Sequence, residues 1–384
     1  MTPGREGDIY ERIGVLRVIN ASGKMTMLGG TAVAPEVASA MAEAAQSYVS
    51  IEALLTRAGA YIADITGAEA ACVTSGASAG IAQMVAACIA GTDTTRIERL
   101  PDVEGDRRDV LIQAGHVVSF GAPITQMIRM GGGRPVAIGW ANAVTAAHLT
   151  GAINERTVAM LYVQSHHTVH KGMLDLATCM RMCNERGIPV LVDAAAEEDL
   201  RSYTSLGVDA VTYSGGKAIG GPTSGFIAGR KPLIEACRAQ ERGIARPMKV
   251  GKEQIAGLIE ALRLDMIHDE GATTQVLMAR VDRLVSALSG VPHLVVSTVW
   301  DEAGRAIPRV SLAVASGVPG CTAPALLAHL RDGTPPIYLR GHEASQGTLF
   351  IDPRPLADAD VDVVAQRIAA FCTRLAGVTA TPTQ

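Results

Sequence analysis

The sequence predicts an α/β protein in which a mostly parallel sheet is covered by helices on both faces and is followed by a smaller α+β domain. Between residues 70 and 229, short runs that are apolar throughout alternate with helical stretches, as a sheet buried on both faces requires. After residue 290 the order changes to two strands, a helix, two strands and a helix, which is typical of an α+β domain. A chain of 384 residues, 48% hydrophobic and 19% charged, supports such a core and excludes intrinsic disorder.

The expected elements follow from the spacing of apolar residues. In the first part we predict strands at 15–20, 70–73, 109–112, 135–138, 157–163, 188–193, 209–214 and 225–229, and helices at 35–47, 51–66, 77–90, 124–130 and 175–186. A helical region over 251–289 precedes strands at 293–300, 308–315, 337–340 and 347–352 and helices at 323–330 and 358–375. The charged stretch 96–108 is interpreted as an exposed loop. The expected domains are an N-terminal segment 1–50, a large α/β domain 51–250, and a linker helix with a small α+β domain over 251–384.

Composition excludes several classes of function. The 34 Lys and Arg residues and 38 Asp and Glu residues give a net charge of −4 without long blocks of one sign, so tight nucleic-acid binding is not expected. The seven cysteines lack a CxxC spacing and the start of the chain lacks an apolar signal region, so we expect a cytoplasmic protein. The alanine-rich stretch 70–91 is interpreted as a buried helix rather than a membrane anchor.

The first candidate functional residue is a lysine among glycines. Lys217 follows the predicted strand 209–214 within the sequence YSGGKAIGGP, residues 213–222. Helix or sheet stability does not explain four glycines at this place, so the lysine is expected to approach a ligand closely. An amine that forms a Schiff base acts in its neutral form, and partial burial beside cations lowers the pKa of a lysine. A solvated loop lysine is the alternative.

Two further segments point to a cofactor. Asp193 ends the apolar strand 188–193, and ligands bind at the carboxyl ends of parallel strands. Its carboxylate would suit a protonated pyridine nitrogen, although a strand-end Asp also caps turns. Ser75, Gly76 and Ala77 form a small-residue turn from a strand into a helix, where backbone N–H groups bind anions. Neither a Walker pattern nor GxGxxG occurs, so the three segments in this order predict a pyridoxal-phosphate (PLP) enzyme of the aspartate-aminotransferase fold.

Longer segments carry a resemblance to one group of such enzymes. They are VINASG (18–23) with LGG (28–30), TSGASAG (74–80), GAPI (121–124), SHHTV (165–169), VDA (192–194), SGGK (214–217), RPMKVGKE (246–253) and IDPRPL (351–356). Over residues 12–376 the chain resembles the selenocysteine-synthase-like PLP enzymes of fold type I, and within them the D-glucosaminate-6-phosphate ammonia-lyase type.

The resemblance implies roles for the candidate residues. Lys217 would hold the cofactor through an imine, and Asp193 would pair with the pyridine nitrogen. His116 lies where related enzymes place a residue that stacks on the ring; a histidine in a surface turn is the alternative. The cofactor phosphate would be bound by Ser75, Gly76, Ala77 and Ser214.

The histidine-rich segment 165–170 follows the strand 157–163 on the same expected edge of the sheet. Adjacent side chains point in opposite directions on extended chain, so one of the histidines would face the cofactor, and we favour His166 over His167 as a catalytic acid. No metal site is expected. Cys179 and Cys183 are four residues apart on a predicted helix and are interpreted as packing residues.

Arginines are expected to bind the substrate carboxylate, because the planar guanidinium matches it bidentately. Arg340, which ends the predicted strand 337–340, is the first choice, and Arg354 and Arg246 are the competitors. Arg246, Lys249 and Lys252 form a local basic cluster. This cluster would bind a substrate phosphate or the cofactor phosphate of a neighbouring subunit, or it is a solvated basic loop.

The function expected from these residues and the resemblance is a PLP-dependent ammonia-lyase. It would eliminate and deaminate a β-hydroxy amino acid, such as sugar-derived D-glucosaminate 6-phosphate, to a 2-keto acid and ammonia. An aminotransferase, racemase or aldolase would use nearly the same groups. A catalytically silent PLP-binding scaffold is disfavoured because both Lys217 and Asp193 are present. Selenocysteine synthase itself is disfavoured because its additional N-terminal tRNA-binding segment has no counterpart here. The resemblance also implies a homodimer or higher homo-oligomer.

Overall fold

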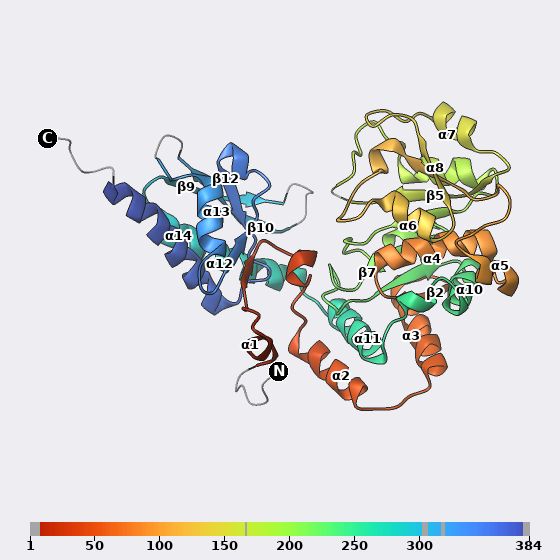
Figure 1. The fold of residues 1–384 in the computed structure, drawn as a ribbon, viewed down its shortest axis with the longest axis horizontal. Helices are drawn as coiled ribbons and strands as arrows, with labels where there is room; N and C mark the ends of the chain where they lie inside the picture. Colours follow the sequence, from red (N-terminus) through yellow and green to blue (C-terminus); the bar gives the residue numbers. More distant parts are fainter. Residues whose placement is uncertain (1–7, 166, 302–305, 316–318, 379–384) are drawn as a thin grey trace. The chain divides into compact units, whose positions relative to one another are not determined.

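The computed structural model describes residues 8–165, 167–301, 306–315 and 319–378. The chain divides into two compact units, which are described separately (Figure 1). Unit 1 is discontinuous and comprises Met1–Ala32 with His268–Gln384, and unit 2 comprises Val33–Ile267. The domain boundaries expected at residues 50 and 250 stay a prediction. No helix that the structure describes is both long and apolar enough to cross a membrane.

Unit 2 is built on a seven-stranded sheet with the order β2-β8-β7-β6-β5-β3-β4. The strand β8 runs antiparallel to its neighbours β2 and β7, and the other neighbouring strands are parallel. The predicted fold class, a mostly parallel sheet with helices on both faces, is confirmed. The strands are β2 (Ala70–Thr74), β3 (Asp109–Gln113), β4 (Arg134–Ile138), β5 (Thr157–Val163), β6 (Val190–Asp193), β7 (Ala210–Ser214) and β8 (Gly225–Gly229).

Both faces of this sheet are buried because successive side chains of a strand point to opposite faces. Leu111 packs in one core with residues of the helices α3 and α11, whereas Val110 and Ile112 pack in another with residues of α4 and α6. The helices of unit 2 are α2 (Pro35–Ala45), α3 (Ile51–Thr66), α4 (Ala77–Ala90), α5 (Thr94–Arg99), α6 (Ile124–Met130), α7 (Ala146–Ala152), α8 (Leu176–Asn184), α9 (Ser202–Leu206), α10 (Lys231–Ala239) and α11 (Lys252–Met266).

The expectation of an exposed loop over 96–108 is wrong for its first residues, which belong to α5. The carboxylate of Asp93 accepts a hydrogen bond from the backbone N–H of Arg96 at 3.1 Å and so caps the start of this helix. Ile97 is buried, with 1% of its surface exposed. One cap and one buried apolar side chain therefore stabilise a turn of helix within a charged stretch.

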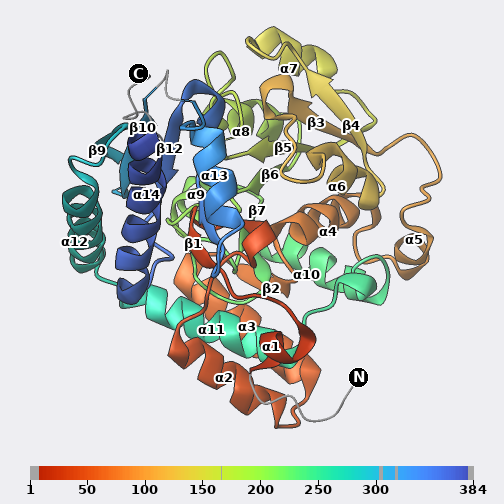
Figure 2. The same ribbon diagram turned by 60° about the vertical axis from the view of Figure 1, so that its left-hand side comes forward.

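Unit 1 contains an antiparallel sheet in the order β12-β10-β9 and a parallel pair of β1 with β11. The helices α12 and α14 pack against each other, and α12 also contacts β9 and β10 (Figure 2). The strands are β1 (Ile19–Ala21), β9 (Leu294–Trp300), β10 (Pro308–Val314), β11 (Ile337–Leu339) and β12 (Thr348–Ile351). The helices are α1 (Ile9–Ile13), α12 (Glu270–Leu288), α13 (Ala323–Arg331) and α14 (Asp358–Val378).

The N-terminal strand is shorter than the predicted 15–20 and starts later. Ile19 pairs with Ile337 of β11, and Ala21 pairs with Leu339. The backbone N–H of Asp352 donates to the carbonyl of Ala21 at 2.9 Å. Ile19 and Ala21 are therefore part of the core of unit 1.

Candidate functional site

The carboxyl ends of the parallel strands in unit 2 lie at one edge of the sheet. Val163 of β5 is in register with Asp193 of β6, which is in register with Thr212 of β7. Two residues further along β7, Ser214 pairs with the first residue of β8, which also pairs with Thr74 of β2. The sheet thus brings the predicted turn after β2, the acid of β6 and the lysine segment after β7 to a single edge, where ligands of open α/β sheets bind.

Asp193 is a buried carboxylic acid with 7% of its surface exposed. Its Oδ1 accepts a hydrogen bond from the backbone N–H of Ala195 at 3.2 Å. Burial raises the pKa of Asp193 to about 6, and the positive charge of Lys217 and this hydrogen bond oppose the rise. A buried carboxylate of this kind is stabilised by a cationic partner, and a protonated ring nitrogen would serve as one.

The lysine segment is a tight turn between β7 and β8. The backbone N–H of Gly215 donates to the carbonyl of Ser224 at 2.8 Å, and that of Gly221 donates to the carbonyl of Gly215 at 2.7 Å. A Cβ atom on Gly215 would lie 2.3 Å from Oγ of Ser224, so a larger residue does not fit there. Lys217 is half-buried in this turn, and its charge acts on Asp193.

The turn after β2 leads into the N-terminus of α4. Gly76 is the N-cap residue, and within the described part of the chain no side chain caps this helix end. The backbone N–H groups of the first turn are therefore available to an anion. Ser75 is half-buried beside them, and Ala77 begins the helix.

His116 is buried behind the same edge, with none of its surface exposed. Its Nδ1 accepts a hydrogen bond from the backbone N–H of Val163 at 3.2 Å, so the neutral ring carries its proton on Nε2. Among the described residues, Nε2 has no hydrogen-bond partner. Burial lowers the pKa of His116 to about 4, and the charge of His170 adds to this effect. The buried position rules out the alternative of a histidine in a surface turn, and the stacking of His116 on the cofactor ring stays a prediction.

The histidine-rich segment after β5 is described in part. His166 lies outside the described residues, and His167 is exposed. His170, which the sequence did not single out, lies near His116 with a ring centroid distance of 5.6 Å. Its Nε2 is 2.7 Å from Oγ1 of Thr168, and this contact fixes the orientation of the ring.

Unit 1 gathers charged side chains around Asp352, which is fully buried. Arg354 binds both carboxylate oxygens, with Nε to Oδ1 at 3.0 Å and Nη2 to Oδ2 at 2.7 Å. Arg309 Nε lies 3.5 Å from Oδ2, and Arg340 Nη1 lies 4.0 Å from it. Burial alone would raise the pKa of Asp352, but Arg354 and then Arg309 hold it below its usual value. The structure therefore brings Arg340 and Arg354 together.

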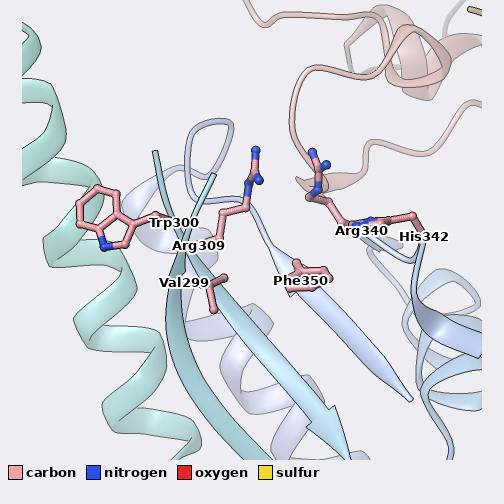
Figure 3. Close-up of a pocket in the computed structure, with 6 residues that line it drawn as sticks. All are labelled: Val299, Trp300, Arg309, Arg340, His342 and Phe350. Carbon is pink, nitrogen blue, oxygen red and sulfur yellow. The ribbon is translucent and has the colours of Figure 1, made fainter. Parts of the chain in front are cut away.

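Sequence reasoning missed Arg309. It belongs to β10, in which Val310 and Leu312 face the core of unit 1, so Arg309 points to the opposite face of the sheet (Figure 3). Its side chain forms a buried ion pair with Asp301. The alternation of an arginine with apolar residues was visible in the sequence. This alternation does not show which residues contact the face of the strand that carries Arg309.

The predicted basic cluster is not a single group of exposed charges. Arg246 and Lys249 are exposed. Lys252 donates from Nζ to the carbonyls of Ala44 and Ala45, at 2.8 Å for the latter, and so binds the C-terminus of α2. The role of Arg246 in substrate binding stays a prediction. Cys179 and Cys183 are buried in the core, which confirms their interpretation as packing residues.

Comparison with known proteins gives matches over most of the chain. The family model SelA: L-seryl-tRNA selenium transferase matches residues 18–289. D-glucosaminate-6-phosphate ammonia lyase of Salmonella typhimurium is 45% identical over 96% of this chain and 98% of its own. The 5'-C-glycyluridine monooxygenase-decarboxylase of a Streptomyces species is 42% identical over 94% of this chain and 90% of its own.

Solved structures show the same similarity to an ammonia-lyase. A structure of D-glucosaminate-6-phosphate ammonia-lyase superposes with a TM-score of 0.91 and 43% identity, covering 97% of this chain and 100% of that chain. A serine palmitoyltransferase solved with PLP shares the fold, with a TM-score of 0.55 and 16% identity over 94% of this chain and 88% of that chain.

Proposed function

The chain belongs to the SelA, or L-seryl-tRNA selenium transferase, family, and from this premise we propose that it is a PLP-dependent ammonia-lyase acting on an amino-sugar acid. It is a homologue of D-glucosaminate-6-phosphate ammonia lyase at 45% identity. The observation that carries the proposal is that a buried acid, Asp193, and a half-buried lysine, Lys217, lie at one edge of the sheet and interact through their charges.

The residues at this edge fit PLP. Asp193 is buried, and its carboxylate would hold a protonated pyridine nitrogen. The uncapped N-terminus of α4, with Ser75, Gly76, Ala77 and Ser214 nearby, would hold the phosphate. His116 would stack on the ring, and Lys217 would bind the aldehyde carbon. When bound, PLP supplies an electron sink that stabilises the carbanion left by loss of the α-proton.

The protein residues then have distinct tasks. The neutral amine of Lys217 would take the α-proton of the substrate. The β-hydroxyl leaves as water after it receives a proton, for which His166 remains our proposed donor. Hydrolysis of the bond between Cα of the dehydrated substrate and its amino nitrogen then gives a 2-keto acid and ammonia. Asp193 would stay ionised because a protonated ring nitrogen would stabilise its negative charge. Arg340 is proposed to hold the substrate carboxylate, with Arg354 and Arg246 as competitors.

Replacement of Lys217 tests this assignment. We expect Lys217→Ala to lose the visible absorbance of the lysine-bound cofactor and to release ammonia at least about 10²-fold more slowly. Lys231→Ala is the matched control, because Lys231 is an exposed residue at the start of α10. A wild-type protein that carries no chromophore after incubation with PLP would contradict the proposal.

One panel of substrates separates the possible reactions. Ammonia and keto acid formed from D- or L-configured β-hydroxy amino acids without a keto-acid acceptor indicate a lyase. Conversion that requires the acceptor indicates an aminotransferase, while inversion or aldehyde release indicates a racemase or an aldolase. The 42% identity to a monooxygenase-decarboxylase favours one further candidate, which would consume dioxygen and release carbon dioxide. Its activity would disappear under anaerobic conditions, whereas ammonia elimination would persist.

A further inference from the structure

The side chain of Gln113 lies at the end of β3 and is fully buried, with none of its surface exposed. Its Oε1 accepts a hydrogen bond from the backbone N–H of Leu174 at 2.7 Å, and its Nε2 donates to the carbonyl of Leu174 at 3.0 Å. The amide thus exchanges two hydrogen bonds with one residue, as two paired residues of antiparallel strands do. Leu174 belongs to the loop 167–174, which follows β5.

The residues after Gln113 contact the same loop. The carbonyl of Gly115 accepts a hydrogen bond from the backbone N–H of Val169 at 2.9 Å. A Cβ atom on Gly115 would lie 2.7 Å from Sδ of Met173 and 2.7 Å from the carbonyl oxygen of Val169, so a side chain at this position would push the loop away. The ring of His116 lies against the ring of His170. These contacts hold the loop 167–174 against the turn that follows β3.

The orientation of the His116 ring depends on this loop. The backbone N–H of Val163 donates to Nδ1 of His116, and Tyr162 packs edge-on against the ring at a centroid distance of 4.7 Å. The loop adds the contact with His170, whose own ring is oriented by Thr168. Among the residues that the structure describes, Nε2 of His116 has no hydrogen-bond partner, so no bond at this nitrogen fixes the ring.

The hydrogen bonds of Gln113 fix the distance between the loop and β3. They are directional, whereas apolar packing tolerates small displacements. Without the amide, the backbone N–H and C=O groups of Leu174 would lose these partners beside a buried strand end, and the loop would move to bring them to water. The position of His170 against His116 would then be lost.

We propose that Gln113 is a positioning residue, which acts through the loop 167–174 to keep the His116 ring in one orientation at the ligand edge of the sheet. The inference rests on the proposed function only where it concerns the cofactor, since His116 is proposed there to stack on the ring of PLP. A ring that is no longer held in place would stack less well on PLP and would become accessible to solvent.

Modification of histidine by diethyl pyrocarbonate tests this role in the cofactor-free protein. The reagent acylates a neutral ring nitrogen that solvent reaches, and mass spectrometry gives the initial rate at each histidine. His116 is fully buried and should react slowly in the wild type, while the exposed His167 gives a reference rate. We expect Gln113→Met to raise the rate at His116 about tenfold or more, because loss of two hydrogen bonds lets the loop open more often.

Gln240→Met is the matched control. Gln240 is also fully buried, and its Nε2 donates to the carbonyls of Gly91 and Ala236, each at 2.9 Å. Gly91 follows the C-terminus of α4, the opposite end of this helix from the ligand edge. This variant should therefore change the rate at His116 by less than about twofold. If Gln113→Met does not fold, Gly115→Ala displaces the same loop by one methyl group and is measured in its place.

Slow labelling of His116, as in the wild type, in a folded Gln113→Met or Gly115→Ala would overturn the positioning role. An equal increase in Gln240→Met would overturn it too, because the effect would then be a general loss of stability.

Titration with PLP separates this inference from the proposed function. We expect Gln113→Met to raise the dissociation constant of PLP about threefold or more and to shift the visible absorbance of the lysine-bound cofactor, because a stacking contact is weakened. Faster labelling of His116 with unchanged PLP binding would support the positioning role and contradict the stacking of His116. Faster labelling together with a wild type that binds no PLP would also support the positioning role and would contradict the proposed function alone.

Discussion

At the scale of single residues, Asp193 is an acid whose ionised form is disfavoured until a cation faces it. Its pKa is raised to about 6 by burial in the protein without cofactor, against 3.8 for the ordinary side chain. The folded state therefore binds a proton more tightly than the unfolded state does. The contribution of the protonated Asp193 carboxyl group to the free energy of unfolding is fully present below pH 3.8. It is lost as the pH rises through 6.

The raised pKa of Asp193 predicts a different pH dependence of stability for the cofactor-free wild type and for Asp193→Asn, because asparagine does not titrate. We expect the free energy of unfolding of the wild type, relative to this variant, to fall by about 2 kcal/mol between pH 4 and pH 7. Denaturant unfolding at several pH values measures it. A relative stability that does not change over this interval would show that the carboxyl group is not buried as described.

Asp175 supplies a control with the opposite sign. Its carboxylate accepts a hydrogen bond from the backbone N–H of Thr178 at 2.7 Å, which lowers the pKa of Asp175. The stability of the wild type relative to Asp175→Asn should therefore decrease as the pH falls, not as it rises.

Residues at strand ends were predictable from the sequence, and residues on strand faces were not. Asp193 and Lys217 were found because each lies next to a run of apolar residues that ends at the ligand edge. Arg309 was missed because the sequence of β10 does not show which residues contact the face of the strand that carries Arg309. His170 was missed because its proximity to His116 depends on the path of a loop.

At the scale of elements, the segment after β1 passes close to Asp352 at a glycine, Gly23. Gly23 has a φ of +96°, and a Cβ atom on it would lie 2.8 Å from Oδ2 of Asp352. We expect Gly23→Ala to lower the free energy of unfolding by about 1–3 kcal/mol, because the left-handed backbone and the contact both oppose a side chain. Thermal or denaturant unfolding measures this loss.

Gly29→Ala is the matched control. Gly29 also has a positive φ, +88°, but a Cβ atom on it would meet nothing within 4 Å. It should therefore show the cost of the backbone alone, roughly 1–2 kcal/mol. Equal losses in the two variants would mean that Gly23 does not approach Asp352.

Long periodic elements were predicted closely, and short ones were not. The helices α3, α4 and α6 and the strands β5 and β8 have the predicted bounds. The helices α5 and α7 are short and depend on caps, at Asp93 and Thr145, that a pattern of apolar residues does not register. Their existence follows from local hydrogen bonds rather than from periodicity.

At the scale of the whole molecule, the core of unit 1 combines residues 19–21 with the C-terminal part of the chain. Ile19 and Ala21 pack in the same core as residues of β10, α13 and α14. Two of the segments that carry the family resemblance, VINASG and IDPRPL, meet there, since Asp352 bonds to Ala21. No periodicity links segments more than 300 residues apart, so this pairing was not predictable from the sequence pattern.

The central claim is a carbon–nitrogen bond between Lys217 and the cofactor aldehyde. Borohydride reduction of the PLP-loaded wild type, followed by proteolysis and mass spectrometry, tests it most directly. The account predicts a pyridoxyl phosphate mass on the peptide that contains Lys217, and its absence from Lys217→Ala. A cofactor mass on a different lysine, or none on the protein, would contradict the account.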